Sequence, residues 1–374
     1  MKLAIERAAL LRSLSHVQAV VERRTTIPIL SNVKLAAGGD GLHLTATDMD
    51  LSMASSETAR VQDDGVTTVS AHTLFDIVRK LPDGSEVLIE QEPNASEISV
   101  RAGRAVFTLP CIKADEFPAM DGDAEAYDVT FDMPAADLRK LIDKTRFAIS
   151  TEETRYYLNG IHVHASGAGA TAVLRGVATD GHRLAKIEIA LPDGAEGIPS
   201  IIIPRKTVTE LRKLIDAIDG EIRVKVSTNR IQFVLDQAVL VSRLIDGTFP
   251  DYERVIPVGN EKVAAIDTKL FAETVDRVST ISTERARAIK LRFDDGRITA
   301  SAVSTEAGRA VEELDADYAG EPLEIGFNSR YILDMLAEVA GDQVRLEMAN
   351  PAAPTLVRDP ADGSVVYVLM PMRV

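Results

Sequence analysis

The chain has 374 residues, of which 45% are hydrophobic and 26% charged, and this composition is that of a soluble globular protein of two or three domains. Its formal net charge of −15 argues against wrapping of nucleic acid by bulk attraction, because phosphates would be repelled at long range. The single cysteine, Cys111, excludes a disulfide framework and a cysteine-based metal cluster, and the lack of a long apolar run predicts a cytoplasmic protein without a membrane span.

The chain begins with a helix-and-strand pattern in which the helices have one apolar face. Helices are expected over residues 10–21 and 72–81. In the second, Leu74, Ile77 and Leu81 are spaced by three and then four residues, which places them on one face of a helix. Strands with apolar side chains at alternate positions are expected at 31–37, 42–47 and 86–91. This alternation predicts antiparallel sheets with one buried face, on which the helices pack.

The same pattern occurs twice more, at intervals of about 125 residues. The further helices are expected at 138–147, 208–215, 270–278 and 332–339. The further strands are expected at 159–165, 171–178, 221–226, 288–293, 297–303 and 343–348. The repeat predicts an α+β fold of three tandem copies of one domain, with boundaries at 1–126, 127–257 and 258–374. Three unrelated α+β domains remain the alternative interpretation.

The predicted helices are basic, whereas the rest of the chain is strongly acidic. Residues 7–24, for example, contain four Arg and one Glu. If the helices lie on one side of a continuous sheet, that side faces phosphate and the other side repels it. The helices of two chains, at roughly 9–10 Å between axes, would enclose a hole of about 25 Å, which admits a duplex roughly 20 Å wide. Ordinary solvated helix faces, which usually carry Lys and Arg, are the alternative.

Five segments are distinctive when they are taken together. They are TTIPILSN (25–32), RYYLNG (155–160), ATDGHRLA (178–185), DGTFPDYERVIP (246–257) and VLMPMRV (368–374). In this combination and order they resemble the bacterial sliding clamp family, the DNA polymerase III beta subunits, over essentially the whole chain. The resemblance implies clamp domains that form a ring as a homodimer, encircle double-stranded DNA without sequence specificity and make the replicative polymerase processive. It also implies no catalytic residue and no cofactor.

The resemblance further implies a pocket that binds short peptides of partner proteins, between the second and third domains. The partners implied are the catalytic subunit of the replicative polymerase, the clamp loader, repair polymerases and mismatch-repair proteins. Leu, Val and Met would form an adaptable apolar cavity for a peptide's Leu or Phe, while Arg and Thr would hold its polar ends. The matching positions are Leu158, Thr179, Gly181, His182, Arg183, Leu184, Pro250, Arg254, Val255, Val368, Met370, Pro371, Met372 and Arg373.

Two other surfaces are implied by the same resemblance. The positions that match the DNA-facing residues of the family are Arg24, Tyr156, Tyr157, Arg205 and Lys206. Arginine and lysine meet phosphates, and tyrosines pack against sugars or an exposed base. The positions that match the head-to-tail dimer interface are Phe107 and Leu109 on one face and Ile281 on the other, although each is equally typical of a core residue.

Enzymatic interpretations have weaker support. His162 and His164 lie two apart on a predicted strand, a spacing that can chelate metal, but no carboxylate or cysteine set accompanies them, so no metal site is expected. Asp180 and His182 could form an acid–base pair with a nearby serine, but the sequence has no nucleophile elbow, Walker motif or dinucleotide fingerprint. A peptide-binding scaffold without DNA and a hydrolase that uses His182 therefore remain as alternatives to a DNA-encircling clamp.

Overall fold

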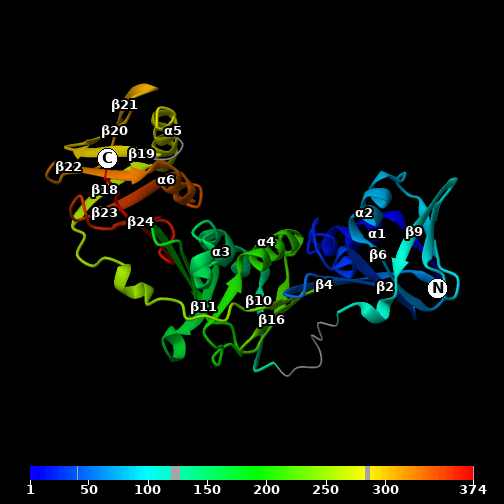
Figure 1. Ribbon diagram of the computed structural model, residues 1–374. Helices are drawn as coiled ribbons and strands as arrows, with labels where there is room; N and C mark the ends of the chain where they lie inside the picture. The colour runs from blue at the N-terminus through cyan, green and yellow to red at the C-terminus, as the bar shows by residue number, and fades with distance from the viewer. Residues whose placement is uncertain (40, 119–126, 283–286, 374) are drawn as a thin grey trace. The chain divides into compact units, whose positions relative to one another are not determined.

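A computed structural model describes residues 1–39, 41–118, 127–282 and 287–373 (Figure 1). The chain forms two compact units, the first from Met1–Ala135, Pro192–Pro199 and Thr209–Leu244, and the second from Ala136–Leu191, Ser200–Val208 and Ile245–Val374. The expected domain boundary at residue 126 lies outside the described residues. Among the residues described, no helix is long and apolar enough to cross a membrane.

The first unit contains helices α1 (Arg7–Val17) and α2 (Ala71–Lys80), which pack on a large antiparallel sheet (Figure 1), and the later part of α4 (Arg205–Leu214). Helix α1 packs against strands β3 and β4, and helix α2 packs beside it on β2 and β6. The strands of the unit are β1 (Lys2–Glu6), β2 (Asn32–Gly38), β3 (Gly41–Thr47), β4 (Leu51–Thr58), β5 (Arg60–Asp63), β6 (Gly65–Ser70), β7 (Glu86–Glu90), β8 (Glu97–Ala102), β9 (Ala105–Ile112), β10 (Val129–Pro134), β15 (Glu221–Val226), β16 (Arg230–Val234) and β17 (Ala238–Arg243).

The second unit repeats this construction over two sheets. Its helices are α3 (Ala135–Arg146), the start of α4 (Arg205–Leu214), α5 (Thr268–Ser279) and α6 (Ser329–Leu336). Its strands are β11 (Gly160–Ser166), β12 (Val173–Thr179), β13 (Arg183–Ala190), β14 (Ile201–Pro204), β18 (Lys262–Asp267), β19 (Ala288–Asp294), β20 (Arg297–Ser304), β21 (Gly308–Asp315), β22 (Leu323–Asn328), β23 (Gln343–Met348), β24 (Thr355–Arg358) and β25 (Val365–Leu369). The prediction of an α+β fold with three tandem helix-and-sheet repeats is confirmed.

The predicted helices are all present, but the first ends earlier than its apolar pattern indicates. It was expected to reach Val21, and α1 ends at Val17. Beyond that point the amides of Val20 and Val21 bond to carbonyls three residues back, so the chain continues in tighter turns. Both valines are nonetheless buried, which explains why the periodicity extended to them.

Strands of neighbouring repeats pair with each other inside each unit. In the first unit β4 of the first repeat pairs with β17 of the second, and in the second unit β13 pairs with β25 of the third repeat. By their order in the repeat, β21 corresponds to β4 and β13, while β9 corresponds to β17 and β25. Within the described part of the chain, β21 is the edge of its sheet, and β9 has a partner beyond β8 only at Cys111 and Ile112.

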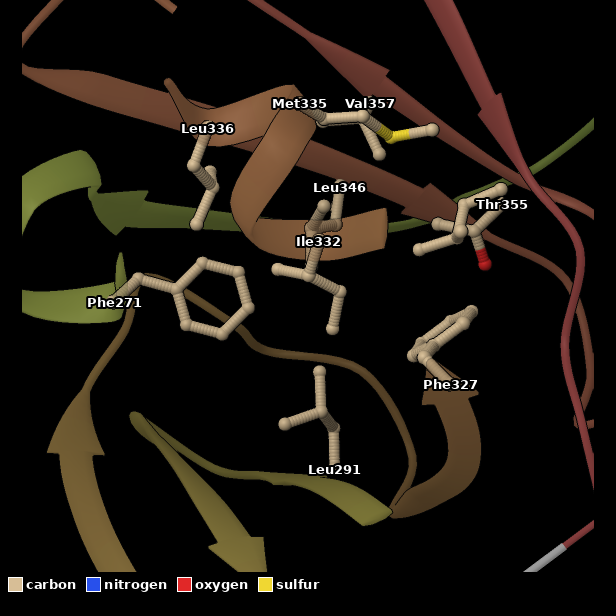
Figure 2. A pocket seen from close by; sticks show the side chains of 10 residues that line it. Phe271, Leu291, Phe327, Ile332, Met335, Leu336, Leu346, Thr355 and Val357 are labelled. Atoms are coloured by element: carbon tan, nitrogen blue, oxygen red, sulfur yellow. The ribbon is translucent and has the colours of Figure 1, made fainter. Parts of the chain in front are cut away.

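In the third repeat, helices α5 and α6 cover one face of the sheet. Phe271 of α5 and Ile332 of α6 meet Leu291 of β19 and Phe327 of β22 in a tightly packed core (Figure 2). The remaining cavity is only about 10 Å³, and apart from Thr355 the residues that line it are apolar.

Candidate functional site

A pocket of about 280 Å³ opens in the second unit, and four of the five distinctive segments contribute residues to it. Its walls come from the residues before β11, the turn between β12 and β13, the segment after Phe249 and the end of β25. The lining residues are Arg155, Tyr157, Leu158, Thr179, Gly181, Arg183, Leu184, Pro250, Asp251, Tyr252, Val255, Val368 and Met370. Most of the lining is apolar, which suits a ligand that inserts hydrophobic side chains.

The floor of the pocket is part of the hydrophobic core. Leu158, Leu184 and Val368 are each at most 3% exposed and belong to one cluster with Phe249 and Tyr252. Leu184 and Val368 lie directly opposite each other in the ladder of β13 and β25. The floor is therefore built on paired strands, and its shape is fixed by the sheet.

The turn between β12 and β13 has a conformation that favours glycine. The Thr179 hydroxyl donates to the carbonyl of Arg183 over 2.7 Å, and Oδ1 of Asp180 accepts from the amides of His182 and Arg183. Gly181 has a φ of 88°, and a Cβ atom there would lie 2.7 Å from Nη1 of Arg155. A side chain at this position would be strained and would displace a residue of the pocket wall.

The first unit contains the same turn between β3 and β4. The Thr47 hydroxyl donates to the carbonyl of Leu51, and Oδ1 of Asp48 accepts from the amides of Asp50 and Leu51. Met49 occupies the left-handed position with a φ of 81°. The repeat has therefore preserved this backbone conformation although the residue at its strained position has changed.

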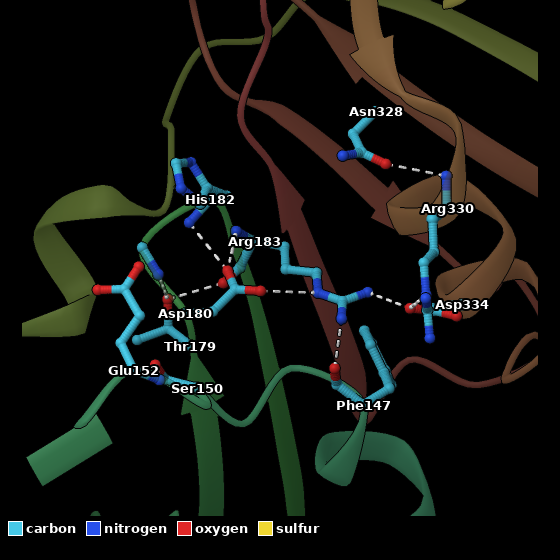
Figure 3. A network of polar contacts seen from close by, with 11 residues as sticks. Phe147, Ser150, Glu152, Thr179, Asp180, His182, Arg183, Asn328, Arg330 and Asp334 are labelled. Carbon is cyan, nitrogen blue, oxygen red and sulfur yellow. Dashed lines mark hydrogen bonds and ion pairs between the residues drawn. The ribbon is translucent and has the colours of Figure 1, made fainter. Parts of the chain in front are cut away.

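Arg183 is held inside the second unit and is only 8% exposed (Figure 3). Its guanidinium donates to Oδ2 of Asp180 over 3.1 Å, to Oδ2 of Asp334 over 2.6 Å and to the carbonyl of Phe147 over 2.6 Å. It also lies over the ring of Tyr331 at 4.4 Å. The charge of Arg183 is thus already compensated by the protein, although the residue lines the pocket.

Three family models match consecutive parts of the chain. The N-terminal, central and C-terminal domains of the DNA polymerase III beta subunit match residues 1–121, 132–251 and 253–373. The chain belongs to the DNA polymerase III beta subunit family.

Relatives of this family are similar to the chain over its full length. The beta sliding clamp of Caulobacter vibrioides is 52% identical over 374 residues, which is 100% of both chains. A crystal structure of the C. crescentus beta sliding clamp has a TM-score of 0.97 at 51% identity and covers 100% of this chain and 99% of that one. A sliding clamp from Bartonella birtlesii, crystallised with griselimycin, has a TM-score of 0.97 at 44% identity and covers 100% of both chains.

The beta-subunit pattern predicted fourteen pocket positions, and the structure brings nine of them together around the pocket described above. The others lie near it without lining it. His182 stacks on Tyr331, Arg254 pairs with Asp251 over 2.6 Å, and the Met372 amide donates to the carbonyl of Gly326. Pro371 is half-buried and Arg373 is exposed.

Four lining residues were not singled out for the pocket from the sequence. They are Arg155, Tyr157, Asp251 and Tyr252. All four lie in the segments RYYLNG and DGTFPDYERVIP, so their place in the distinctive motifs was the available signal. Tyr157 was instead predicted to face DNA, and in this member of the beta-subunit family its ring packs on the core cluster below the pocket.

The other predicted DNA-facing residues fall into two places. Tyr156, Arg205 and Lys206 surround a shallow depression of about 360 Å³, together with residues such as Ser150 and Asn159. Tyr156 is 54% exposed, and the Arg205 amide donates to the carbonyl of Asn159 at the start of α4. Arg24 is exposed in the first unit, in the stretch that follows α1.

The predicted dimer residues lie on β9 in the first unit and just after α5 in the second. Phe107 is half-buried and Leu109 is buried on β9, where Leu109 faces Ile98 of β8. Ile281 is half-buried just after α5. Their role in an interface stays a prediction for this beta subunit.

The two histidines on β11 are part of a packed aromatic group. His162 stacks on Phe249 with ring centroids 4.6 Å apart, and His164 lies 4.8 Å from His162. Burial, and the neighbouring His164, lower the pKa of His162 to about 4. Among the residues described, no group of three or more His, Cys, Asp or Glu side chains is arranged to hold a metal ion.

Proposed function

We propose that the chain is the sliding clamp of a replicative DNA polymerase, a non-catalytic ring that encircles duplex DNA and holds other proteins there. The observation that carries the proposal is the apolar pocket on the floor of β13 and β25, in a chain that matches all three beta-subunit domains. We place the domain boundaries near residues 126 and 257 and the protein in the cytoplasm, where bacterial DNA is replicated.

The pocket has the chemistry of a peptide-binding site. Leu158, Leu184 and Val368 form a rigid apolar floor, and Met370, which is 38% exposed, provides an adaptable rim. A partner peptide would insert Leu or Phe there, and a few such side chains would supply most of the binding free energy. The expected partners are the polymerase catalytic subunit, the clamp loader, repair polymerases and mismatch-repair proteins. Griselimycin, which was crystallised with the B. birtlesii clamp, would be a ligand of the same pocket.

The open strand edges support closure of two chains into a ring. Wherever the repeat continues inside the chain, its fourth strand pairs with the last strand of the next repeat, as β4 does with β17 and β13 with β25. The remaining copies of these two strands are β21 and β9, whose edges are open in the described part of one chain. They carry exposed valines, Val311 and Val106 respectively. Pairing of β21 with β9 of a second chain, and the reverse, would form a homodimer with two equivalent contacts.

Contact with DNA would be made locally and held by enclosure. The depression beside Tyr156, Arg205 and Lys206 offers basic and aromatic groups to a sugar–phosphate backbone, and Arg24 offers another basic group. The net charge of −15 would keep these contacts weak. Weak contacts would let the protein slide, while the closed ring would prevent its loss.

Retention on DNA of different topology tests the proposal. The protein would be loaded onto a nicked circle by a clamp loader with ATP, and the circle would then be cut once. We expect the protein to stay on the circle and to leave the cut DNA, unless both ends are blocked by bound streptavidin. Retention on cut DNA with free ends would refute a topological link and favour direct binding.

A further inference from the structure

One wall of the pocket is formed by the segment 249–255, which follows β17 after a stretch without regular secondary structure. Pro250, Asp251, Tyr252 and Val255 all line the pocket. The amide of Ile256 donates to the carbonyl of Glu253, and the side chain of Arg254 pairs with Asp251. Both interactions are local, so they do not connect the segment to a strand. The position of the wall relative to the floor therefore depends on side-chain contacts with the neighbouring strands.

Strands β11 and β12 supply these contacts. His162 of β11 stacks on Phe249 with an angle of 6° between the rings. Nε2 of His164, also on β11, lies 2.9 Å from the Tyr252 hydroxyl, and Nη1 of Arg175 on β12 lies 3.3 Å from it. His164 and Arg175 are direct partners in the antiparallel ladder, so the Tyr252 hydroxyl bridges two adjacent strands.

The direction of each hydrogen bond in this group follows from its chemistry. Nδ1 of His164 lies 2.9 Å from the carbonyl of Ala165, which can only accept, so Nδ1 of the neutral ring carries the hydrogen and Nε2 accepts. Arg175 can only donate, so the Tyr252 oxygen accepts from Arg175 and donates its own hydrogen to His164. Burial raises the pKa of Tyr252, which keeps the hydroxyl protonated at neutral pH.

Arg175 is held in place by two carboxylates as well as by the hydroxyl. Its Nε donates to Glu188 of β13 over 2.8 Å, and its Nη1 donates to Glu253 over 2.6 Å. Lys186 also pairs with Glu188, at 3.0 Å. Glu253 lies in the wall, so Arg175 contacts the wall at two consecutive residues.

We propose that His164 and Arg175 are positioning residues of the pocket, which hold the Tyr252 hydroxyl and thereby fix the wall 249–255 for a bound peptide. Neither His164 nor Arg175 lines the pocket. Without its hydroxyl contacts the wall samples more positions, and binding then includes the entropy cost of ordering it. This inference rests on the proposed peptide-binding function of the pocket.

The test compares four variants of the full-length protein at pH 7.5. The probes are a short fluorescein-labelled peptide that contains Leu and Phe, followed by anisotropy, and griselimycin, followed by calorimetry. We expect His164→Ala, which removes one hydrogen bond of the Tyr252 hydroxyl, to raise Kd about three- to tenfold. Tyr252→Phe removes the contacts to both His164 and Arg175 and should raise Kd at least as much. The double variant should be no weaker than Tyr252→Phe alone, because that substitution already removes the contact to His164. His164→Gln should restore binding, because its side-chain oxygen can accept the hydrogen bond.

Several outcomes separate this inference from the proposed function. Met370→Ala serves as a control within the pocket itself, and thermal unfolding reports whether each variant is folded. If the wild type binds both probes and Met370→Ala weakens them, unchanged Kd values for Tyr252→Phe and His164→Ala would overturn the positioning role alone. The same conclusion would follow if these variants lowered only the melting temperature, or if His164→Gln bound as poorly as His164→Ala. If the wild type binds neither probe, the proposed function of the pocket fails, and the inference fails with it.

Discussion

Nη1 of Arg183 lies 2.6 Å from Oδ2 of Asp334, a contact that joins strand β13 to helix α6. Since the same guanidinium is also bonded to Asp180 and Phe147, we expect Arg183→Ala to lower the free energy of unfolding by about 2–4 kcal/mol, measured by urea denaturation. Arg330 approaches Asp334 only at 3.9 Å from an exposed position, so Arg330→Ala should cost less than about 1 kcal/mol. An Arg183→Ala variant that loses peptide affinity at unchanged stability would contradict this structural role.

Met370 should contribute more to peptide binding than Met372. Met370 lines the pocket and is partly exposed, whereas Met372 is half-buried outside the lining and its amide bonds to Gly326. We expect Met370→Ala to weaken a Leu- and Phe-containing peptide by about 1–2 kcal/mol, or roughly five- to thirtyfold in Kd. Met372→Ala is the matched control and should change Kd less than about threefold. Calorimetry gives the Kd of the peptide for both variants. A larger increase in Kd for Met372→Ala than for Met370→Ala would require a different pocket boundary.

The stability of the protein should fall in mild acid because of His162. Its pKa in the folded protein is about 4, below the ordinary value of 6.5, so between these pH values the unfolded chain binds the proton more readily. The contribution of neutral His162 to the free energy of unfolding is fully present above pH 6.5 and is lost as the pH falls to 4. The loss is at most about 3 kcal/mol. His162→Phe keeps a ring against Phe249 without a titrating group. Urea unfolding at pH 7 and pH 4.5 should show a smaller difference for this variant, and an equal difference would exclude His162 as the cause.

The open edge of β21 should control association of two chains. Val311 on this edge is 62% exposed, and a lysine there would place a charge in the proposed strand pairing. We expect Val311→Lys to raise the dimer dissociation constant at least about tenfold in sedimentation equilibrium, with little change in thermal unfolding of the monomer. Val258 is 95% exposed and lies in a loop, so Val258→Lys is the control for added charge. Equal association of all three proteins would place the interface elsewhere.

The duplicated turn should respond in opposite ways to glycine and alanine. Gly181→Ala puts a Cβ atom into the left-handed region beside Arg155, and we expect a loss of about 1–2 kcal/mol in unfolding free energy. Met49→Gly removes a side chain from the same conformation in the first unit and should gain roughly 0.5 kcal/mol, after the entropy cost of glycine. A loss of stability in Met49→Gly would mean that the Met49 side chain makes a contribution larger than the strain.

The sequence predicted the repeated elements well because each depends on local periodicity. The helix at 72–81 appears as α2 (Ala71–Lys80). Of the predicted apolar face, Leu74 and Leu81 are buried, whereas Ile77 is only half-buried and Val78 is buried in its place. The prediction of helix ends was weaker, as at Val20 and Val21, because tight turns can bury the same positions. Periodicity also said nothing about which strands would pair between repeats, such as β4 with β17, because such pairing joins segments far apart in the sequence.

The candidate site was predictable only in part, for a related reason. Resemblance to the family indicated Leu158, Leu184 and Val368, which do converge on the pocket. It did not indicate that the charge of Arg183 is satisfied internally, because this depends on Asp334, which is 151 residues away. The link from His164 to Tyr252 spans 88 residues and likewise has no local signal in the sequence.

Leu184 and Val368 face each other across two hydrogen-bonded strands, and this arrangement limits how the pocket can select between partner peptides. The floor of the pocket cannot widen or narrow without breaking hydrogen bonds between β13 and β25, so it has the same shape for every bound peptide. Differences in affinity between partner proteins must then arise at the rim of the pocket, from the flexible side chain of Met370 and the loop around Tyr252. Substitutions at Met370 or in the loop should therefore change the order of affinities among the partner proteins, while all of them still bind to the same floor.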